Sequence, residues 1–192
     1  MCAGNGKRWN NYLGIPKHLV KINGETLIGR TTRLLKEKNI NDYIITCNNN
    51  IYAEYGKTIE QTFNDCEIDR FEESVANDEI CYLYGDVYYS KNAIDTIINT
   101  QTKDILFFGS KYEIFAVKIK DLGLFFEHKR KVKKLFLNNQ IDRCIGWEIY
   151  RSLNNIPFNE HKITDRYIKI IDETDDIDFP EDYEKFMQRG QK

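Results

Sequence analysis

Strand-like and helix-like segments alternate along the first half of the chain, and this alternation limits the fold more than any other feature. The ranges 42–48 and 79–86 are short apolar runs that are typical of buried strands. The ranges 26–39 and 90–100 repeat apolar residues at helical spacing. Strands connected through helices pair in parallel, with right-handed crossovers. Because a strand pair over 104–119 adds antiparallel pieces, we predict a three-layer α/β protein with a mixed, mostly parallel sheet.

Weaker patterns complete the predicted order of elements. We expect helices over 121–140, 146–155 and 180–188, and a strand over 166–172. The segment 52–63 fits a helix, and 66–71 fits a strand.

Composition bounds the class of protein. The 192 residues carry 41% hydrophobic and 30% charged side chains, which is ordinary for one globular domain. The net charge of -2 gives no support for nucleic-acid binding. Five cysteines, an odd number without a CxxC pair, predict neither a disulfide framework nor a zinc knuckle. Since no apolar run approaches the roughly 20 residues that span a bilayer, we expect a cytoplasmic protein without a membrane partner.

The chain opens with a glycine-rich, positively charged loop. Gly4 and Gly6 lack a Cβ, so the backbone there can turn successive N–H groups toward a phosphate. Lys7, Arg8 and Lys17 add positive charge. In α/β folds such loops bind ligands beyond the carboxyl ends of the strands. The loop therefore predicts a phosphate-bearing ligand, although an ordinary surface loop remains the alternative.

Two familiar phosphate loops are excluded, one by a single position and the other by two. The dinucleotide pattern GxGxxG fails because Trp9 stands where the third glycine belongs. The P-loop pattern fails because Met1 replaces its first glycine and Arg8 follows the lysine in place of Ser or Thr.

The loop instead resembles the signature of the nucleotidyltransferases that make sugar nucleotides and related CDP or CMP compounds. AGNGKR at 3–8, followed by PK at 16–17, is similar to the family pattern A-G-x-G-x-R…P-K. YLYGDVYYS at 82–90 and DIDFPEDYEKF at 176–186 resemble its strand-end aspartate and its closing helix start. The resemblance implies one nucleotidyltransferase domain over 1–192 with a three-layer, Rossmann-like fold. Family members have about five apolar residues before this pattern, where this sequence has only Met1 and Cys2, so we expect the first central strand to be truncated or replaced.

The resemblance also implies a reaction and its residues. A phosphate oxygen of one substrate attacks the α-phosphorus of a nucleoside triphosphate, and pyrophosphate leaves. Arg8 would bind the leaving pyrophosphate, and Lys17 would neutralise charge at the α-phosphate. Asp86 and Asp178 would hold Mg²⁺, with Asp176 as a competitor for the second place. The triphosphate would lie on the backbone amides of Ala3, Gly4, Asn5, Gly6 and Lys7.

Base and acceptor selection is assigned to two further groups. Arg70, Ser74 and Asn77 are candidates for reading the base, and we expect CTP rather than UTP or GTP. Trp147 and Glu148 would meet the acceptor, because an aromatic ring beside a carboxylate suits a cationic or amine-bearing phosphate ester. We therefore expect a small phosphorylated acceptor of the phosphoglutamine or phosphocholine type, used for cell-surface polysaccharide or capsule modification.

Several alternatives stay open at this point. A sugar-1-phosphate or molybdopterin-type nucleotidyltransferase would use the same fold, and a non-catalytic nucleotide-binding relative would keep the loop alone. Asp86 fits a turn residue, Asp178 fits a helix N-cap, and Trp147 fits plain packing. Whether the chain forms a homodimer is left open by the sequence.

Overall fold

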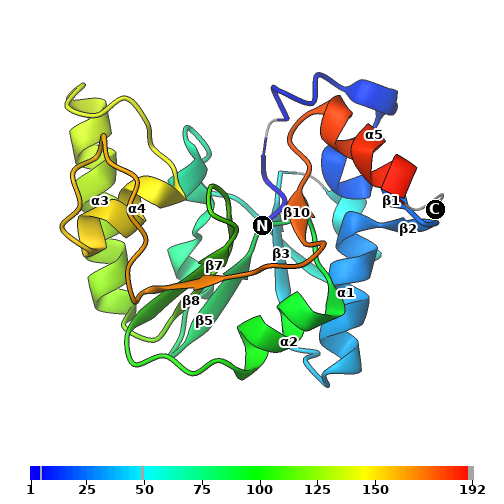
Figure 1. Cartoon of the computed structure of the whole chain (residues 1–192), viewed down its shortest axis with the longest axis horizontal. Helices are drawn as coiled ribbons and strands as arrows, with labels where there is room; N and C mark the ends of the chain where they lie inside the picture. Colours follow the sequence, from blue (N-terminus) through cyan, green and yellow to red (C-terminus); the bar gives the residue numbers. More distant parts are fainter. Residues whose placement is uncertain (5, 49, 190–192) are drawn as a thin grey trace. The chain divides into compact units, whose positions relative to one another are not determined.

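The computed structural model describes residues 1–189 except Asn5 and Asn49. Contacts among the residues divide the chain into two compact units, which are described in turn (Figure 1). Unit 1 consists of Met1–Glu60, Tyr84–Asn99 and Ile171–Lys192, and unit 2 of Gln61–Leu83 and Thr100–Ile170. Both contain helices and strands, so the α/β prediction is confirmed.

A parallel strand pair lies beside the chain start in unit 1. Strand β3 (Ile44–Cys47) pairs in parallel with β4 (Lys57–Glu60). On its other side, β3 receives a hydrogen bond of 2.7 Å from the Cys2 N–H to the Thr46 carbonyl, and Cys2 forms a parallel bridge with Cys47. The Met1 carbonyl in turn accepts from the Gly85 N–H at 2.9 Å. The two residues before the glycine loop thus make strand-type hydrogen bonds to segments on both sides.

The remaining chain of unit 1 adds a hairpin, helices and short turns. Strands β1 (Lys21–Ile22) and β2 (Glu25–Thr26) form an antiparallel hairpin that leads into helix α1 (Leu27–Glu37). Thr26 caps α1 by accepting a hydrogen bond of 3.0 Å from the Gly29 N–H. Short 3-10 turns lie at Tyr12–Gly14, Lys17–Leu19 and Asn50–Tyr52.

Two segments from the middle and the end of the sequence meet in unit 1. Strand β6 (Val87–Tyr88) pairs antiparallel with β10 (Asp175–Asp176). Helix α2 (Lys91–Asn99) follows β6, and Ser90 caps it by accepting a hydrogen bond from the Ala93 N–H at 2.8 Å. Helix α5 (Pro180–Arg189) follows β10 and starts at proline, which suits a first helical turn.

Unit 2 is built on one four-stranded sheet in the order β5-β8-β7-β9. The strands are β5 (Ile80–Leu83), β8 (Ile114–Ile119), β7 (Ile105–Gly109) and β9 (Tyr167–Lys169). Strand β8 pairs antiparallel with both β5 and β7, whereas β9 pairs in parallel with β7. Helices α3 (Leu122–Leu137) and α4 (Gly146–Leu153) contact each other, as Figure 1 also shows. Short 3-10 turns occupy Glu67–Arg70 and Glu73–Val75.

Two of the weaker secondary-structure predictions are wrong. The range 52–63 contains β4 in place of a helix, because Thr58 and Ile59 favour a strand and β3 offers a parallel partner. The range 66–71 forms a 3-10 turn in place of a strand. There the Asp69 carboxylate accepts hydrogen bonds from the N–H groups of Asp65 and Cys66, and such local bonds compete with a sheet.

The sheet is less continuous than the sequence suggests. Among the described residues, the strands form four small sheets with four antiparallel and two parallel pairings. A single sheet that is mostly parallel is therefore not what these strands display. The three-layer arrangement and the single domain over 1–192 stay predictions.

Candidate active site

Several residues of the opening loop have left-handed backbone conformations. Positive φ angles of 56, 48, 54, 58 and 67° occur at Gly6, Asn10, Asn11, Leu13 and Gly14. Glycine adopts positive φ angles without steric strain, and asparagine does so more easily than most residues. At Leu13 the positive φ angle is energetically unfavourable. Ala3 is buried and Lys7 is exposed, while Asn5 lies outside the described residues. The loop therefore turns tightly within a short stretch of chain, with Gly4 and Gly6 half-buried.

Trp9, the residue that breaks the dinucleotide pattern, anchors this loop to the core of unit 1. Its ring is only 2% exposed and contacts a cluster that includes Val20, Ile177 and Phe186. Its indole N–H donates to the Ile15 carbonyl at 2.8 Å. Burying a tryptophan of this size stabilises the loop strongly, so Trp9 fixes where the charged residues on either side of it lie. Sequence reasoning missed this role.

Four predicted site residues converge in unit 1. The Lys17 ammonium lies 2.5 Å from an Asp86 carboxylate oxygen and 2.7 Å from an Asp178 carboxylate oxygen. The Arg8 guanidinium lies 2.6 Å from the other oxygen of Asp178. Lys17 is buried, whereas the Arg8 side chain is 59% exposed. Two cations and two carboxylates thus form one ion cluster that reaches from the interior to the surface.

The β6–β10 ladder explains how two aspartates 92 positions apart reach the same lysine. Val87 pairs with Asp176, and Asp86 and Asp178 lie one and two residues beyond that pair, so the ladder brings them close together. The Asp86 carbonyl accepts a hydrogen bond of 2.9 Å from the Ile177 N–H. This ladder has no detectable signal in the sequence, because a two-residue strand has no periodicity to detect.

The start of α5 holds Asp178 in place. The Asp182 carboxylate accepts hydrogen bonds from the N–H groups of Asp178 and Phe179, at 3.3 and 3.0 Å. Asp182 therefore satisfies the helix start from within its first turn. The Arg8 guanidinium also lies over the Phe179 ring, 5.4 Å from its centroid. Asp176, the competitor for the second carboxylate, lies within β10.

The charged groups of the cluster shift the pKa values of Asp86 and Lys17. Burial opposes the charged form of Asp86, but Lys17 and His18 outweigh it and hold the pKa of this carboxyl well below its usual range. Burial likewise disfavours the Lys17 ammonium, yet Asp86 and Asp178 raise its pKa above the ordinary lysine value. At neutral pH, Lys17 is therefore a protonated point charge and does not act as a base.

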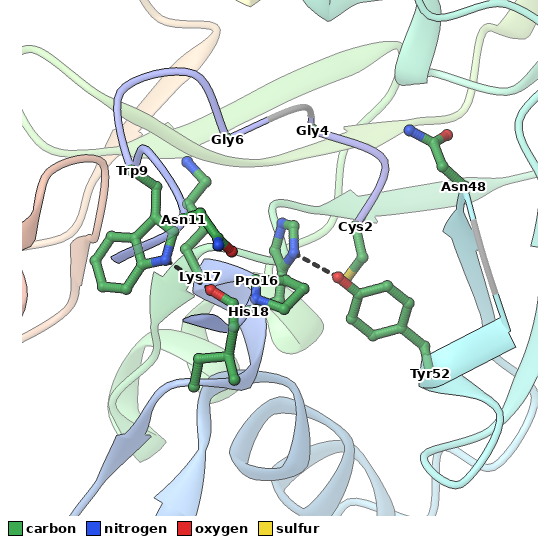
Figure 2. Close-up of a pocket in the computed structure, with 11 residues that line it drawn as sticks. Cys2, Gly4, Gly6, Trp9, Asn11, Pro16, Lys17, His18, Asn48 and Tyr52 are labelled. Carbon is green, nitrogen blue, oxygen red and sulfur yellow. Dashed lines mark hydrogen bonds between the residues drawn. The ribbon is translucent and has the colours of Figure 1, made fainter. Parts of the chain in front are cut away.

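A cavity of about 280 Å³ opens beside the loop (Figure 2). Its lining includes Gly4, Gly6, Lys17, His18 and Tyr52. His18 is buried and lies 2.9 Å from the Tyr52 hydroxyl through its Nδ1 atom. Burial raises the pKa of Tyr52 well above its usual value, so the phenol is neutral. The sequence assigned no function to His18, and only its position directly after Lys17 could have drawn attention to it.

The residues predicted to read the base lie in unit 2. The Arg70 Nε donates to the Asn64 side chain at 3.2 Å, and the Ser74 hydroxyl donates to Glu72 at 2.8 Å. Asn77 is exposed just before β5. Their predicted role is not tested by these contacts.

Trp147 and Glu148, the residues predicted to meet the acceptor, begin α4 in unit 2. The Trp147 ring stacks on Tyr167 with centroids 5.4 Å apart, and its N–H donates to the Tyr112 carbonyl at 2.7 Å. One Glu148 oxygen pairs with Arg151 at 2.9 Å and with Arg143 at 3.2 Å. The other oxygen, Oε2, is buried and has no hydrogen-bond partner among the described residues.

The side chains around Lys17 include two carboxylates that could serve as metal ligands. Within the described part of the chain, no three His, Cys, Asp or Glu side chains come together as a metal-binding group. Two carboxylates, Asp86 and Asp178, nevertheless direct oxygen atoms at one common cation, the Lys17 ammonium. Mg²⁺ is usually held by one or two carboxylates plus phosphate oxygens. The residues therefore fit a magnesium ion that is completed by a bound phosphate.

The fold of the chain is similar to that of solved nucleotidyltransferase structures. The chain is similar to CTP:phosphocholine cytidylyltransferase from Streptococcus pneumoniae, with a TM-score of 0.58, 17% identity, and 98% of this chain and 96% of that chain covered. It is also similar to the inositol-1-phosphate CTP transferase from T. maritima, with a TM-score of 0.62, 12% identity, and coverage of 98% and 93%. No protein-family model and no curated protein matches the sequence.

None of the described helices is both long and apolar enough to cross a membrane. The solved structures share the fold at identities below one fifth.

Proposed function

We propose that the protein transfers a cytidylyl group from CTP to a small phosphorylated acceptor and releases pyrophosphate. The observation that carries the proposal is the convergence of Arg8, Lys17, Asp86 and Asp178 behind a glycine loop that borders a cavity. The acceptor phosphate oxygen forms a bond to the α-phosphorus as the bond from that phosphorus to the pyrophosphate oxygen breaks. Both partners are anions, so the transfer depends on positioning and charge neutralisation.

Lys17 would stabilise the charge that develops at the α-phosphate. It is protonated and buried, so its charge acts in a region of low dielectric. The flexible lysine stem lets the ammonium exchange its aspartate partners for phosphate oxygens when a nucleotide enters.

Arg8 would bind the leaving pyrophosphate. Its side chain is largely exposed and its planar fork can contact two phosphate oxygens at once. The loop amides of residues 3–7 would carry the triphosphate, because glycine lets the backbone approach it closely.

Asp86 and Asp178 would hold the magnesium ion that the nucleotide brings. When bound, Mg²⁺ would neutralise phosphate charge and help to orient the triphosphate. Asp86 is suited to this role because its low pKa keeps it ionised at any pH in the working range. Asp182 positions Asp178 through the two backbone hydrogen bonds at the start of α5.

The base and the acceptor are assigned to unit 2. Arg70, Ser74 and Asn77 are proposed to select cytosine. The free Glu148 oxygen beside the stacked Trp147 ring supports an amine-bearing or cationic acceptor. Phosphoglutamine and phosphocholine are both of this type, and one specific proposal is CTP:phosphoglutamine cytidylyltransferase activity in capsular phosphoramidate biosynthesis.

The test is incubation of the full chain with each nucleoside triphosphate and a panel of phosphorylated metabolites, scored for pyrophosphate. We expect release with CTP and an amine-bearing phosphate ester, and its loss on addition of a chelator. Release only with a sugar-1-phosphate, or with a molybdopterin-type acceptor, would contradict the acceptor assignment and leave the reaction type intact.

A non-catalytic relative gives a different result in the same assay. CTP with Mg²⁺ would raise the melting temperature, but no acceptor would yield pyrophosphate. That outcome would overturn the proposed activity.

A further inference from the structure

Two free cysteines face each other in unit 2, far apart in the sequence. The sulfur atoms of Cys66 and Cys144 lie 2.7 Å apart, and neither is part of a disulfide. A disulfide bond is about 2.05 Å long, so the sulfurs would need to approach by only about 0.7 Å. Cys66 is half-buried, whereas Cys144 is buried.

The backbone around the pair holds the two thiols in this position. The Ile68 N–H donates to the Cys144 carbonyl at 3.4 Å. The Gly146 N–H donates to the Glu67 carboxylate at 2.9 Å. Because both contacts join the 3-10 turn Glu67–Arg70 to the segment before α4, the apposition of the thiols is built into the fold of unit 2.

A charged side chain from α3 completes the cluster. The Lys133 ammonium lies 3.5 Å from the Cys66 sulfur and 2.7 Å from an Asp69 carboxylate oxygen. The hydrogen bond with Cys144 and the charge of Lys133 lower the pKa of Cys66, although burial and Asp69 oppose them. The hydrogen bond with Cys66 and burial raise the pKa of Cys144 well above its usual value. The two thiols are therefore unequal, with the thiolate favoured at the more accessible one.

We propose that Cys66 and Cys144 are a reversible oxidation site that a peroxide converts to a disulfide. The Cys66 thiolate attacks one peroxide oxygen, the O–O bond breaks, and the leaving oxygen takes a proton, which gives a sulfenic acid. The Cys144 sulfur then bonds to the Cys66 sulfur, and the sulfenic hydroxyl leaves with the Cys144 proton as water. Two thiols lose two electrons and the peroxide gains them. The proposal does not depend on the nucleotidyl-transfer reaction.

The role of Lys133 is to favour the attacking thiolate. Lys133→Met removes the facing ammonium, so disulfide formation should slow several-fold, whereas Lys133→Arg keeps the charge and should restore most of the rate. This pair of variants separates an electrostatic role from simple packing of the α3 side chain.

The test treats the full chain with hydrogen peroxide, blocks remaining thiols by alkylation, and maps the cysteine peptides. We expect loss of two hydrogen atoms from the chain, a peptide that links Cys66 to Cys144, and full reversal by dithiothreitol. The disulfide closes a loop of 78 positions, so it should raise the melting temperature by about 5–10 °C.

Matched variants make the outcome decisive. Cys66→Ser should abolish the linked peptide, and Cys81→Ser, which removes the exposed cysteine of the same unit, should leave it unchanged. Should a cysteine variant fail to fold, the order in which wild-type thiols are consumed still decides the question. Consumption of Cys81 before Cys66, or oxidation of Cys66 to a sulfinic acid without linkage, would overturn the proposal.

Discussion

Each unit of this protein contains a cluster of buried charges, and the two clusters differ in what surrounds them. In unit 1, Lys17 pairs with two aspartates and borders a cavity of about 280 Å³ behind a glycine loop. In unit 2, Glu148 pairs with Arg151, whose Nε also donates to the Glu160 carbonyl at 2.6 Å. The Arg151 side chain is therefore held by a backbone carbonyl as well as by its counter-charge.

The difference shows that a buried ion pair by itself does not mark an active site. Removing one partner of any buried pair is costly, so such pairs are weak indicators of function. The unit 1 cluster contains a lysine with a long flexible stem and lies beside a cavity that the glycine loop borders. The following predictions test whether turnover depends on the unit 1 cluster, and whether the Glu148–Arg151 pair, whose second Glu148 oxygen is proposed to meet the acceptor, also stabilises unit 2.

The largest expected effect is on turnover. Lys17→Ala should lower pyrophosphate release by about 10²–10³-fold, because it removes the charge proposed to stabilise the transferring phosphate. The far-UV circular dichroism at the assay temperature should stay native. Lys21→Ala, which changes an exposed lysine of β1, is the matched control and should keep normal turnover. Near-normal turnover of the Lys17 variant would remove the catalytic assignment.

The unit 2 cluster should respond in stability. Glu148→Gln leaves the buried Arg151 guanidinium without a counter-charge, so the free energy of unfolding in urea should fall by about 3 kcal/mol. The control Glu73→Gln alters an exposed pair with Arg130 and should change stability by less than about 1 kcal/mol. Equal effects of the two substitutions would mean that Glu148 is not held as a buried structural charge.

Gly85 directly precedes the site residue Asp86, and neighbouring atoms leave little room for a side chain there. A Cβ at this position would lie 2.6 Å from the Met1 carbonyl oxygen, with the Cys2 sulfur closer still. Gly85→Ala should therefore lower the free energy of unfolding by about 1–3 kcal/mol. Gly24→Ser is the contrasting variant. Gly24 has open space around it, unlike Gly85, and only its positive φ angle of 83° disfavours a side chain. An unchanged urea midpoint for Gly85→Ala would contradict the close approach.

The smallest effect concerns pH. Because the folded-state pKa of Asp86 lies well below its unfolded value of about 3.9, its ionised form stabilises the folded state above that value. This contribution is lost as the pH falls through the folded-state pKa. The stability difference between wild type and Asp86→Asn, measured in EDTA, should be constant from about pH 5 to 7 and shrink below about pH 4. A difference that grows on acidification would contradict the ion pair with Lys17.

The sequence predicted the parts of this molecule whose signals are local. The helices α1, α2, α3 and α4 and the strands β3, β5, β7, β8 and β9 fall within predicted ranges, and α5 extends one residue beyond its range, because apolar periodicity over several residues is informative. The wrong predictions, at 52–63 and 66–71, concern short segments where long-range pairing or a side-chain hydrogen bond decided the structure.

The site also contains features that the sequence signals and features that it does not. The loop motif named Arg8 and Lys17, and motif order named Asp86 and Asp178, so their convergence could be anticipated from the family resemblance. The β6–β10 ladder that produces it could not, and neither could the anchoring of the loop by Trp9. His18 lacks metal-ligand spacing to any other histidine, so its place beside Tyr52 also needed the three-dimensional structure.

The central claim is that the unit 1 cluster is a metal-assisted polyphosphate site, and calorimetric titration of CTP tests it most directly. Wild-type protein should bind CTP in Mg²⁺ and lose most of that binding in EDTA. The double variant Asp86→Asn, Asp178→Asn should bind CTP equally weakly under both conditions, because it has lost the proposed magnesium ligands. Binding by wild type that is insensitive to Mg²⁺, or undiminished binding by the double variant, would contradict the account.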